Sequence, residues 1–174
     1  YPESPYSFSV FSSDVLGSIY EIFISEKLTV QSGSVVLVKK PENVDRDIIT
    51  TPTFIISDIL RNTVLKKCEG KTDKEILKLK FADISCGSGA FLYTVSKYIK
   101  DTTAYNLFDI YKNNIFGLDI AEYAIERTKI LLTLFAITVG EDKEEFEFNL
   151  YKGNTLDFDW HKIEKDFIGF DAIV

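Results

Sequence analysis

The stretch that decides the fold is residues 81–92, which read FADISCGSGAFL. An apolar run leads through Asp83 into a short loop with two glycines, and the loop leads into a pattern with helical periodicity. A strand, a glycine-rich turn and a helix in this order form the first unit of a doubly wound α/β sheet. Glycines in such a turn let a ligand approach the main-chain N–H groups closely. The sequence therefore predicts a ligand loop at residues 85–89.

Strand and helix patterns alternate on both sides of this loop. The predicted strands are Leu77–Ile84, Ile115–Asp119, Glu145–Tyr151 and Phe170–Val174. The predicted helices are Ala90 to about Lys100 and Ala121–Val139, with an insertion-like stretch, Asp101–Asn114, between the first helix and the second strand. Residues 71–174 are thus predicted to form an α/β domain with about four mostly parallel strands.

Residues 1–70 have a different pattern and are predicted to be mainly helical, with a loop in the middle. Apolar residues recur at helical spacing over Asp14–Ile24, and Val35–Val38 is a short strand candidate. Thr51 as N-cap and Pro52 as the first helical residue predict the start of another helix.

The composition is that of an ordinary globular protein. The 174 residues are 45% hydrophobic and 27% charged. No run reaches the roughly 18 apolar residues of a membrane span, and no signal peptide is visible. With only two cysteines and one histidine, neither a disulfide framework nor a metal site is expected. A cytoplasmic location is the default for such a chain.

The net charge of −7 is unevenly distributed along the sequence. It is −2 over residues 1–70, +3 over residues 71–100 and −8 over residues 101–174. A self-sufficient nucleic-acid clamp is basic over much of its surface. If the protein acts on DNA, most phosphate contacts are therefore expected to come from outside this chain.

The glycine loop could belong to several classes of ligand site. A dinucleotide fingerprint needs a third glycine three positions after Gly89, where Leu92 stands, and no Gly-Lys-Ser/Thr of a Walker loop follows. Asp83, just before the loop, suits a cationic group such as an ammonium better than a phosphate. Asp119, which ends the second predicted strand, is placed to bond a pair of ribose hydroxyls, although it would also suit the N-cap of the next helix.

Two further stretches are candidates for contact with an adenine ring. Ile120 would cover one face of the ring. In residues 153–158, which read GNTLDF, Asp157 would accept from the adenine amino group and Phe158 would pack on the ring. The alternative for this stretch is a polar loop with one buried aromatic residue.

At these positions the sequence resembles a known family. Residues 83–92 are similar to the first S-adenosylmethionine motif, D-x-x-C-G-S-G-x-F, of adenine-N6 DNA methyltransferases. The nearest resemblance is to the modification parts of type I and type IIG restriction-modification systems and related phage-defence methylases. Four other stretches resemble further segments of this family, in the family's order: Leu16–Glu21, Thr51-Pro52, Gly117–Ile120 and Gly153–Asp157.

The resemblance implies a Rossmann-like class I methyltransferase fold with S-adenosylmethionine as cofactor. The glycine loop and Asp83 would hold the methionine end, the Thr-Pro pair would close over that end, and the other groups would hold ribose and adenine. The cofactor-binding residues so implied are Thr51, Pro52, Asp83, Ser85, Cys86, Gly87, Ser88, Gly89, Phe91, Asp119, Ile120, Asn154, Asp157 and Phe158.

The family's catalytic tetrapeptide, Asn-Pro-Pro-Tyr, is absent from the sequence. In the family it follows a strand like Phe170–Val174 almost at once. No catalytic residue is therefore expected within the chain. Residues 71–174 are expected to be the first half of a methyltransferase domain, preceded by a helical segment, residues 1–70, that carries the lid motif.

The expected partners follow from the same resemblance. DNA would be contacted through other regions of a longer parent protein, which would also work with a specificity or restriction module. The bare apolar edge of the last strand predicts self-association as well. No contact with a membrane is expected.

Other functions remain open at this point. Protein-glutamine methylases share a similar catalytic tetrapeptide, so a methyltransferase for protein or a small molecule is one alternative. A dehydrogenase domain is another, against which Leu92 counts, and a non-catalytic interaction module is a third. Among residues without an assigned role, the acidic run Glu141–Glu145 and the helix residues Arg127 and Lys129 are expected to be solvated.

Overall fold

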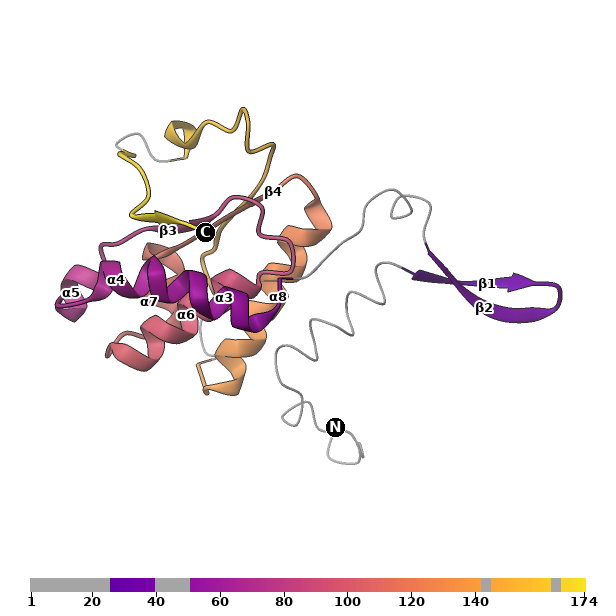
Figure 1. Ribbon diagram of the computed structural model, residues 1–174, viewed down its shortest axis with the longest axis horizontal. Helices are drawn as coiled ribbons and strands as arrows, with labels where there is room; N and C mark the ends of the chain where they lie inside the picture. The colour runs from indigo at the N-terminus through magenta and orange to yellow at the C-terminus, as the bar shows by residue number, and fades with distance from the viewer. Residues whose placement is uncertain (1–25, 40–50, 142–144, 164–166) are drawn as a thin grey trace. The chain divides into compact units, whose positions relative to one another are not determined.

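The computed structural model describes residues 26–39, 51–141, 145–163 and 167–174 (Figure 1). The chain divides into two compact units, Tyr1–Thr50 and Thr51–Val174. The predicted helix over Asp14–Ile24 lies outside the described residues.

The described part of the first unit is a β-hairpin. Strands β1 (Glu26–Gln31) and β2 (Ser34–Lys39) pair antiparallel. Ser32 and Gly33 between them have φ of 50° and 79°. Two consecutive positive φ values are typical of the type I′ turn, which matches the right-handed twist of the two strands. The strand candidate at Val35–Val38 is thus confirmed.

The second unit is built on a four-stranded parallel sheet in the order β5-β4-β3-β6. Its strands are β3 (Phe81–Asp83), β4 (Ile115–Asp119), β5 (Asn149–Lys152) and β6 (Ala172–Ile173). Because β4 and β6 lie on opposite sides of β3, the winding direction reverses there. Ligands of doubly wound sheets bind beyond the carboxyl ends of the strands at such a point. The expected Rossmann-like α/β fold is confirmed.

Helices cover one face of this sheet (Figure 1). They are α3 (Thr53–Asn62), α4 (Val64–Cys68), α6 (Ala90–Thr102), α7 (Leu107–Asn113) and α8 (Glu122–Thr138). The core lies between them and the sheet, where Phe81, Leu92 and Leu132 are fully buried. Phe116, next to the core residue Ile115 in β4, points to the opposite face, where its ring centroid lies 5.4 Å from that of Phe170.

Helices α3 and α4 belong to the unit that carries the sheet. Ile56, Leu60 and Val64 are at most 3% exposed and join the same core as Leu92. The sequence pattern had placed the boundary after residue 70, whereas the contacts divide the chain after Thr50. Helical periodicity shows which face of a helix is apolar, but not which later element will cover that face.

The predicted strand Phe170–Val174 is shorter in the structure, where β6 is Ala172–Ile173. Three further stretches also differ from their predictions. Leu77–Lys80 is not part of a strand, because Thr72 and Glu75 form a capping box that starts the short helix α5 (Asp73–Ile76) just before it. The insertion-like stretch contains α7, which Asn106 caps by accepting from the Asp109 N–H at 2.8 Å.

The third difference concerns β5, which begins at Asn149 and not at Glu145. Asn149 pairs with Phe116, one residue after β4 begins. The residues before Phe148 therefore lie beyond the start of the neighbouring strand. Phe146 and Phe148 pack on Tyr111 instead, with ring centroids 5.4 and 5.3 Å from it.

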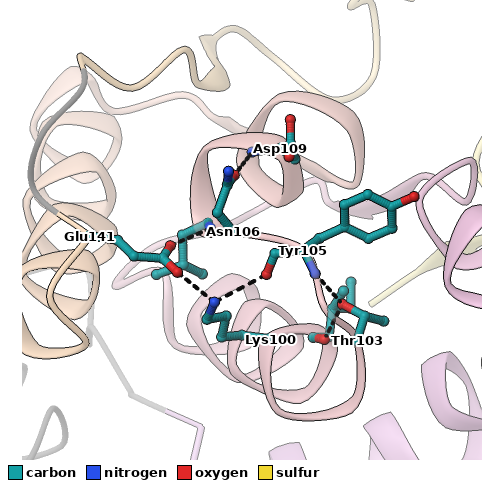
Figure 2. Close-up of polar contacts among 8 residues, drawn as sticks. Lys100, Thr103, Tyr105, Asn106, Asp109 and Glu141 are labelled. Atoms are coloured by element: carbon teal, nitrogen blue, oxygen red, sulfur yellow. Dashed lines mark hydrogen bonds and ion pairs between the residues drawn. The ribbon is translucent and has the colours of Figure 1, made fainter.

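Glu141 links the ends of three helices (Figure 2). Its carboxylate accepts hydrogen bonds from the Lys100 ammonium, at the end of α6, and from the Leu107 N–H, at the start of α7. Lys100 also donates to the Tyr105 carbonyl oxygen at 3.1 Å. The expectation that Glu141 is solvated is wrong, because the turn after α8 brings it between α6 and α7. Arg127 is also buried, at 6% exposure.

Candidate ligand site at the carboxyl ends of the strands

The glycine loop after β3 is joined to the end of β4 by one main-chain hydrogen bond, and a second main-chain bond lies within the loop. The Cys86 N–H donates to the Leu118 carbonyl at 3.0 Å, and the Gly89 N–H donates to the Cys86 carbonyl at 2.6 Å. Gly87 and Gly89 have φ of 47° and 78°, in the left-handed region that favours glycine. Ser85 is exposed at the outer side of the loop, whereas Cys86 is buried. The loop therefore exposes Ser85 and keeps Cys86 in the core.

Asp119 joins this loop to the segment that follows β4. Its Oδ2 accepts from the Gly87 N–H at 2.9 Å and its Oδ1 from the Ala121 N–H at 2.8 Å. The N-cap of α8 is Ala121. The alternative prediction that Asp119 is the N-cap is therefore wrong. A carboxylate oxygen accepts more than one hydrogen bond, and both oxygens of Asp119 therefore retain capacity for ligand hydroxyls.

Asp83 is the most buried acid of the site. It is 5% exposed, and its Oδ1 accepts from the Ser85 N–H at 3.1 Å. Burial raises the pKa of Asp83 to about 6, and the negative charge of nearby Asp119 adds to the effect. A buried carboxylate with so little compensation favours a proton or a cationic ligand group beside it.

Hydrogen bonds join the loop after β5 to the segments that follow β3 and β4. The Gly153 N–H donates to the Asp119 carbonyl at 2.9 Å, and the Thr155 hydroxyl donates to the Ile84 carbonyl. The Phe158 ring packs so closely on Gly153 that a side chain at position 153 would clash with it. The structure thus brings the segments after β3, β4 and β5 together at one end of the sheet.

The remaining predicted residues lie around these three loops. Ile120 is 61% exposed, next to Asp119. Asn154 and Asp157 are exposed, and the Asp157 N–H donates to the Asn154 carbonyl at 3.1 Å. Phe158 is half-buried, with its ring centroid 4.7 Å from that of Trp160.

Three others sit in or just before helices. Phe91, in the first turn of α6, packs against the core. Pro52 is the N-cap of α3 and its carbonyl accepts from the Ile55 N–H at 2.9 Å, with Thr51 half-buried before it. The predicted helix start is therefore one residue early.

Thr128 of α8 supports the glycine loop, a role that the sequence did not indicate. It is fully buried, and its Oγ1 lies 3.8 Å from the Cys86 Sγ. A Cβ atom at Gly89 would lie 2.7 Å from the same Oγ1, so Gly89 packs directly on Thr128. A threonine on an otherwise apolar helix face was the available signal. Burial raises the pKa of the Cys86 thiol to about 12, which keeps it protonated and unreactive.

Neither a metal-binding cluster nor a membrane-spanning helix occurs in the part of the chain that the structure describes. No group of three or more His, Cys, Asp or Glu residues there is arranged to hold a metal ion. No helix there is both long and apolar enough to cross a bilayer.

Comparison with known proteins gives two matches. A sequence model of the family described as N-6 DNA Methylase matches residues 11–174. The type II restriction enzyme and methyltransferase RM.Eco57I of Escherichia coli is 54% identical to this chain over 115 residues. That alignment covers 66% of this chain and 11% of the relative, so the chain spans only a small part of the relative's length.

Proposed function

Because the chain belongs to the N-6 DNA methylase family, we propose that it is the S-adenosylmethionine-binding part of a site-specific DNA adenine-N6 methyltransferase. The parent would act in the cytoplasm as part of a restriction-modification or phage-defence system. The observation that carries the proposal is the pair of carboxylates, Asp83 and Asp119, on either side of the glycine loop.

These carboxylates suit the two ends of the cofactor differently. Asp83, buried and with a raised pKa, would bind the ammonium of the methionine end. Ser85, Cys86, Gly87, Ser88 and Gly89 would pack along that end, with Phe91 behind them and Thr51 and Pro52 closing over it. Each carboxylate oxygen of Asp119 has a further lone pair, and these would accept hydrogen bonds from the two ribose hydroxyls. When bound, S-adenosylmethionine supplies the activated methyl group.

The adenine would lie between the segments after β4 and β5. Ile120 would contact one face of the ring with its exposed side chain. Asp157 would accept from the amino group, Phe158 would pack at the ring edge, and Asn154 would hold the turn that carries them. The exposure of Ile120, Asn154 and Asp157 at the same end of the sheet supports this assignment.

A dinucleotide suits this end of the sheet poorly. Leu92 is fully buried, and a Cβ at Gly117 would lie 2.8 Å from its Cδ1. Its side chain therefore fills the space that a third glycine would leave at the loop. The stretches 84–89 and 153–158 contain no lysine or arginine, so Asp83 and Asp119 would repel a pyrophosphate.

The methylation step itself would need groups beyond residues 1–174. The sequence has no Asn-Pro-Pro-Tyr, and the alignment covers 11% of the E. coli relative. We therefore assign residues 71–174, together with α3 and α4 that share their core, to the first half of the methyltransferase domain. Base flipping, reading of the DNA sequence and any restriction module are assigned to other regions of a longer protein.

Titration calorimetry with S-adenosylmethionine and S-adenosylhomocysteine tests the proposal. The unaltered chain should bind both, and Asp119→Ala should weaken both at least tenfold. Asp101→Ala, which removes an exposed acid at the far end of α6, should change neither and is the matched control. Absence of binding by the unaltered chain, or equal binding by the Asp119 variant, would contradict the proposal. Binding of reduced nicotinamide dinucleotide in its place would favour the dehydrogenase alternative.

A further inference from the structure

Five exposed lysines lie on α4, on α5 and in the turns beside them. They are Lys66, Lys67, Lys71, Lys74 and Lys78, which we call the lysine surface. Among the described residues none of the five forms an ion pair. Five lysines elsewhere in the same unit each pair with a carboxylate, namely Lys97, Lys100, Lys112, Lys129 and Lys152.

Two acids next to the lysine surface accept hydrogen bonds from groups other than these lysines. Asp73 accepts from the Ala104 N–H at 2.9 Å. Glu75 accepts from the Thr72 N–H at 2.8 Å and from the Thr72 hydroxyl at 2.7 Å. Residues 61–80 carry seven basic and three acidic side chains, a local charge of +4 in a chain of net charge −7. The hydrogen bonds from Thr72 lower the pKa of Glu75, and the charges of Lys71 and Lys78 add to the effect. Positive charge is nevertheless in excess here, and none of the five lysines forms an ion pair with a described residue.

The lysine surface lies at the opposite end of the sheet from the candidate ligand site. The Asn114 side chain, just before β4, donates to the carbonyls of Ile76 and Leu79 at 2.8 and 2.7 Å. Helix α6 runs from the glycine loop to Thr102, close to α5 (Figure 1). Its 13 residues correspond to a rise of about 20 Å. The lysine surface is thus separate from the cofactor groups.

The chemistry of the lysine surface indicates its partner. Protein interfaces are depleted in lysine and have an apolar core with aromatic anchors. From Ile56 to Asp119 no large hydrophobic side chain is exposed. The exposed Ile168 lies only at the margin of the lysine surface, in a hollow that it lines together with Lys78. Clustered lysines that form no ion pair suit a phosphate backbone, to which they bind as point charges and release counterions.

We propose that the lysine surface binds the phosphate backbone of duplex DNA, independently of base sequence. The inference rests on the proposed function in one respect, namely that the substrate of the parent protein is DNA. A separation of about 20 Å along the sheet corresponds to about six base pairs. The duplex bound here therefore flanks the target base and does not present it. This chain would then contribute phosphate contacts of its own.

The test compares two fourfold variants of the 174-residue chain with equal change in net charge. One replaces Lys66, Lys67, Lys71 and Lys74 with glutamine. The control replaces the ion-paired Lys97, Lys112, Lys129 and Lys152 with glutamine. Binding to a fluorescein-labelled duplex of about 30 base pairs and arbitrary sequence is followed by anisotropy at several salt concentrations, beginning at low salt.

We expect the first variant to bind at least tenfold more weakly than the unaltered chain at low salt. The slope of log Kd against log salt concentration should be smaller in this variant by up to about 3.6, since each phosphate contact contributes about 0.9 to the slope. The control should keep the slope of the unaltered chain. Both variants should bind S-adenosylhomocysteine as the unaltered chain does, so a failure of the cofactor assignment would be seen separately.

Three results would overturn the proposal. The first is equal weakening in both variants, which would be an effect of net charge alone. The second is no binding of the duplex by the unaltered chain at the lowest salt concentration. The third is binding to polyglutamate in place of the duplex, which would assign the lysine surface to an acidic protein.

Discussion

Replacement of Asp83 with asparagine should stabilise the protein at neutral pH while weakening its binding of the cofactor. The Asp83 carboxylate is 5% exposed and accepts from the Ser85 N–H. Asparagine has nearly the same size and keeps an oxygen to accept this hydrogen bond, but it carries no charge. The substitution therefore removes a buried charge without opening a cavity.

The magnitude follows from the pKa of this carboxyl group. Burial, assisted by the charge on Asp119, raises the pKa of Asp83 from 3.8 to about 6 in the folded protein. A shift of about two units corresponds to about 3 kcal/mol. Because the folded-state pKa is the higher one, the penalty is absent below about pH 4, grows as the pH rises, and is complete above about pH 6. We expect Asp83→Asn to raise the free energy of unfolding by about 1–3 kcal/mol at pH 7.5 and by little near pH 4.

Urea unfolding at pH 7.5 and near pH 4, followed by circular dichroism, measures both values. Asp101→Asn is the matched control, because Asp101 is an exposed acid in an (i, i+4) pair with Lys97 and such pairs contribute about 0.3–0.5 kcal/mol. Calorimetry should show at least tenfold weaker binding of S-adenosylhomocysteine by Asp83→Asn. A variant that is less stable than the unaltered chain at pH 7.5, or equally stabilised at both pH values, would refute the reasoning.

Three further predictions concern the same unit. The affinity for S-adenosylmethionine should fall as the pH is lowered through about 6, because protonated Asp83 no longer attracts the ammonium; calorimetry across this range should show no such fall in Asp83→Asn. Glu141→Gln should lower the free energy of unfolding by about 1–3 kcal/mol, and Glu126→Gln, in an exposed pair, by at most about 0.5 kcal/mol in the same urea titration. Thr128→Leu should displace Gly89 and so weaken the binding of S-adenosylhomocysteine more than that of 5′-methylthioadenosine, which lacks the amino-acid end. If calorimetry shows that the binding of both ligands is weakened equally, the substitution has destabilised the protein in general.

The sequence was most informative where one local cause determines the structure. Residues 115–119 form a strand with the predicted bounds, because a buried parallel strand is a short continuous apolar run. Residues 77–80 follow an equally regular alternating pattern, yet the capping box of Thr72 and Glu75 places a helical turn just before them. Where two local signals meet, hydrophobic periodicity alone does not show which one prevails.

The candidate site was predicted as a set of residues, but its connections were not. The bond from the Gly87 N–H to Asp119 joins residues 32 positions apart, and the bond from Thr155 to the Ile84 carbonyl joins residues 71 apart. Such bonds depend on strand order and register, which no local pattern contains. Glu141 was misassigned for the same reason, since its partners at Lys100 and Leu107 come from two earlier helices.

The distribution of charge relates the two proposed surfaces of the unit. Asp83 and Asp119 place negative charge at the carboxyl ends of the strands, whereas the lysine surface places positive charge near their amino ends. The carboxylates would attract a cationic group and repel phosphates, and the lysines would do the opposite. A DNA duplex would therefore be held at the far end of the unit, with no electrostatic pull toward the cofactor loops. Under the two proposals, the charge of this chain would therefore favour the cofactor at one end of the unit and DNA at the other.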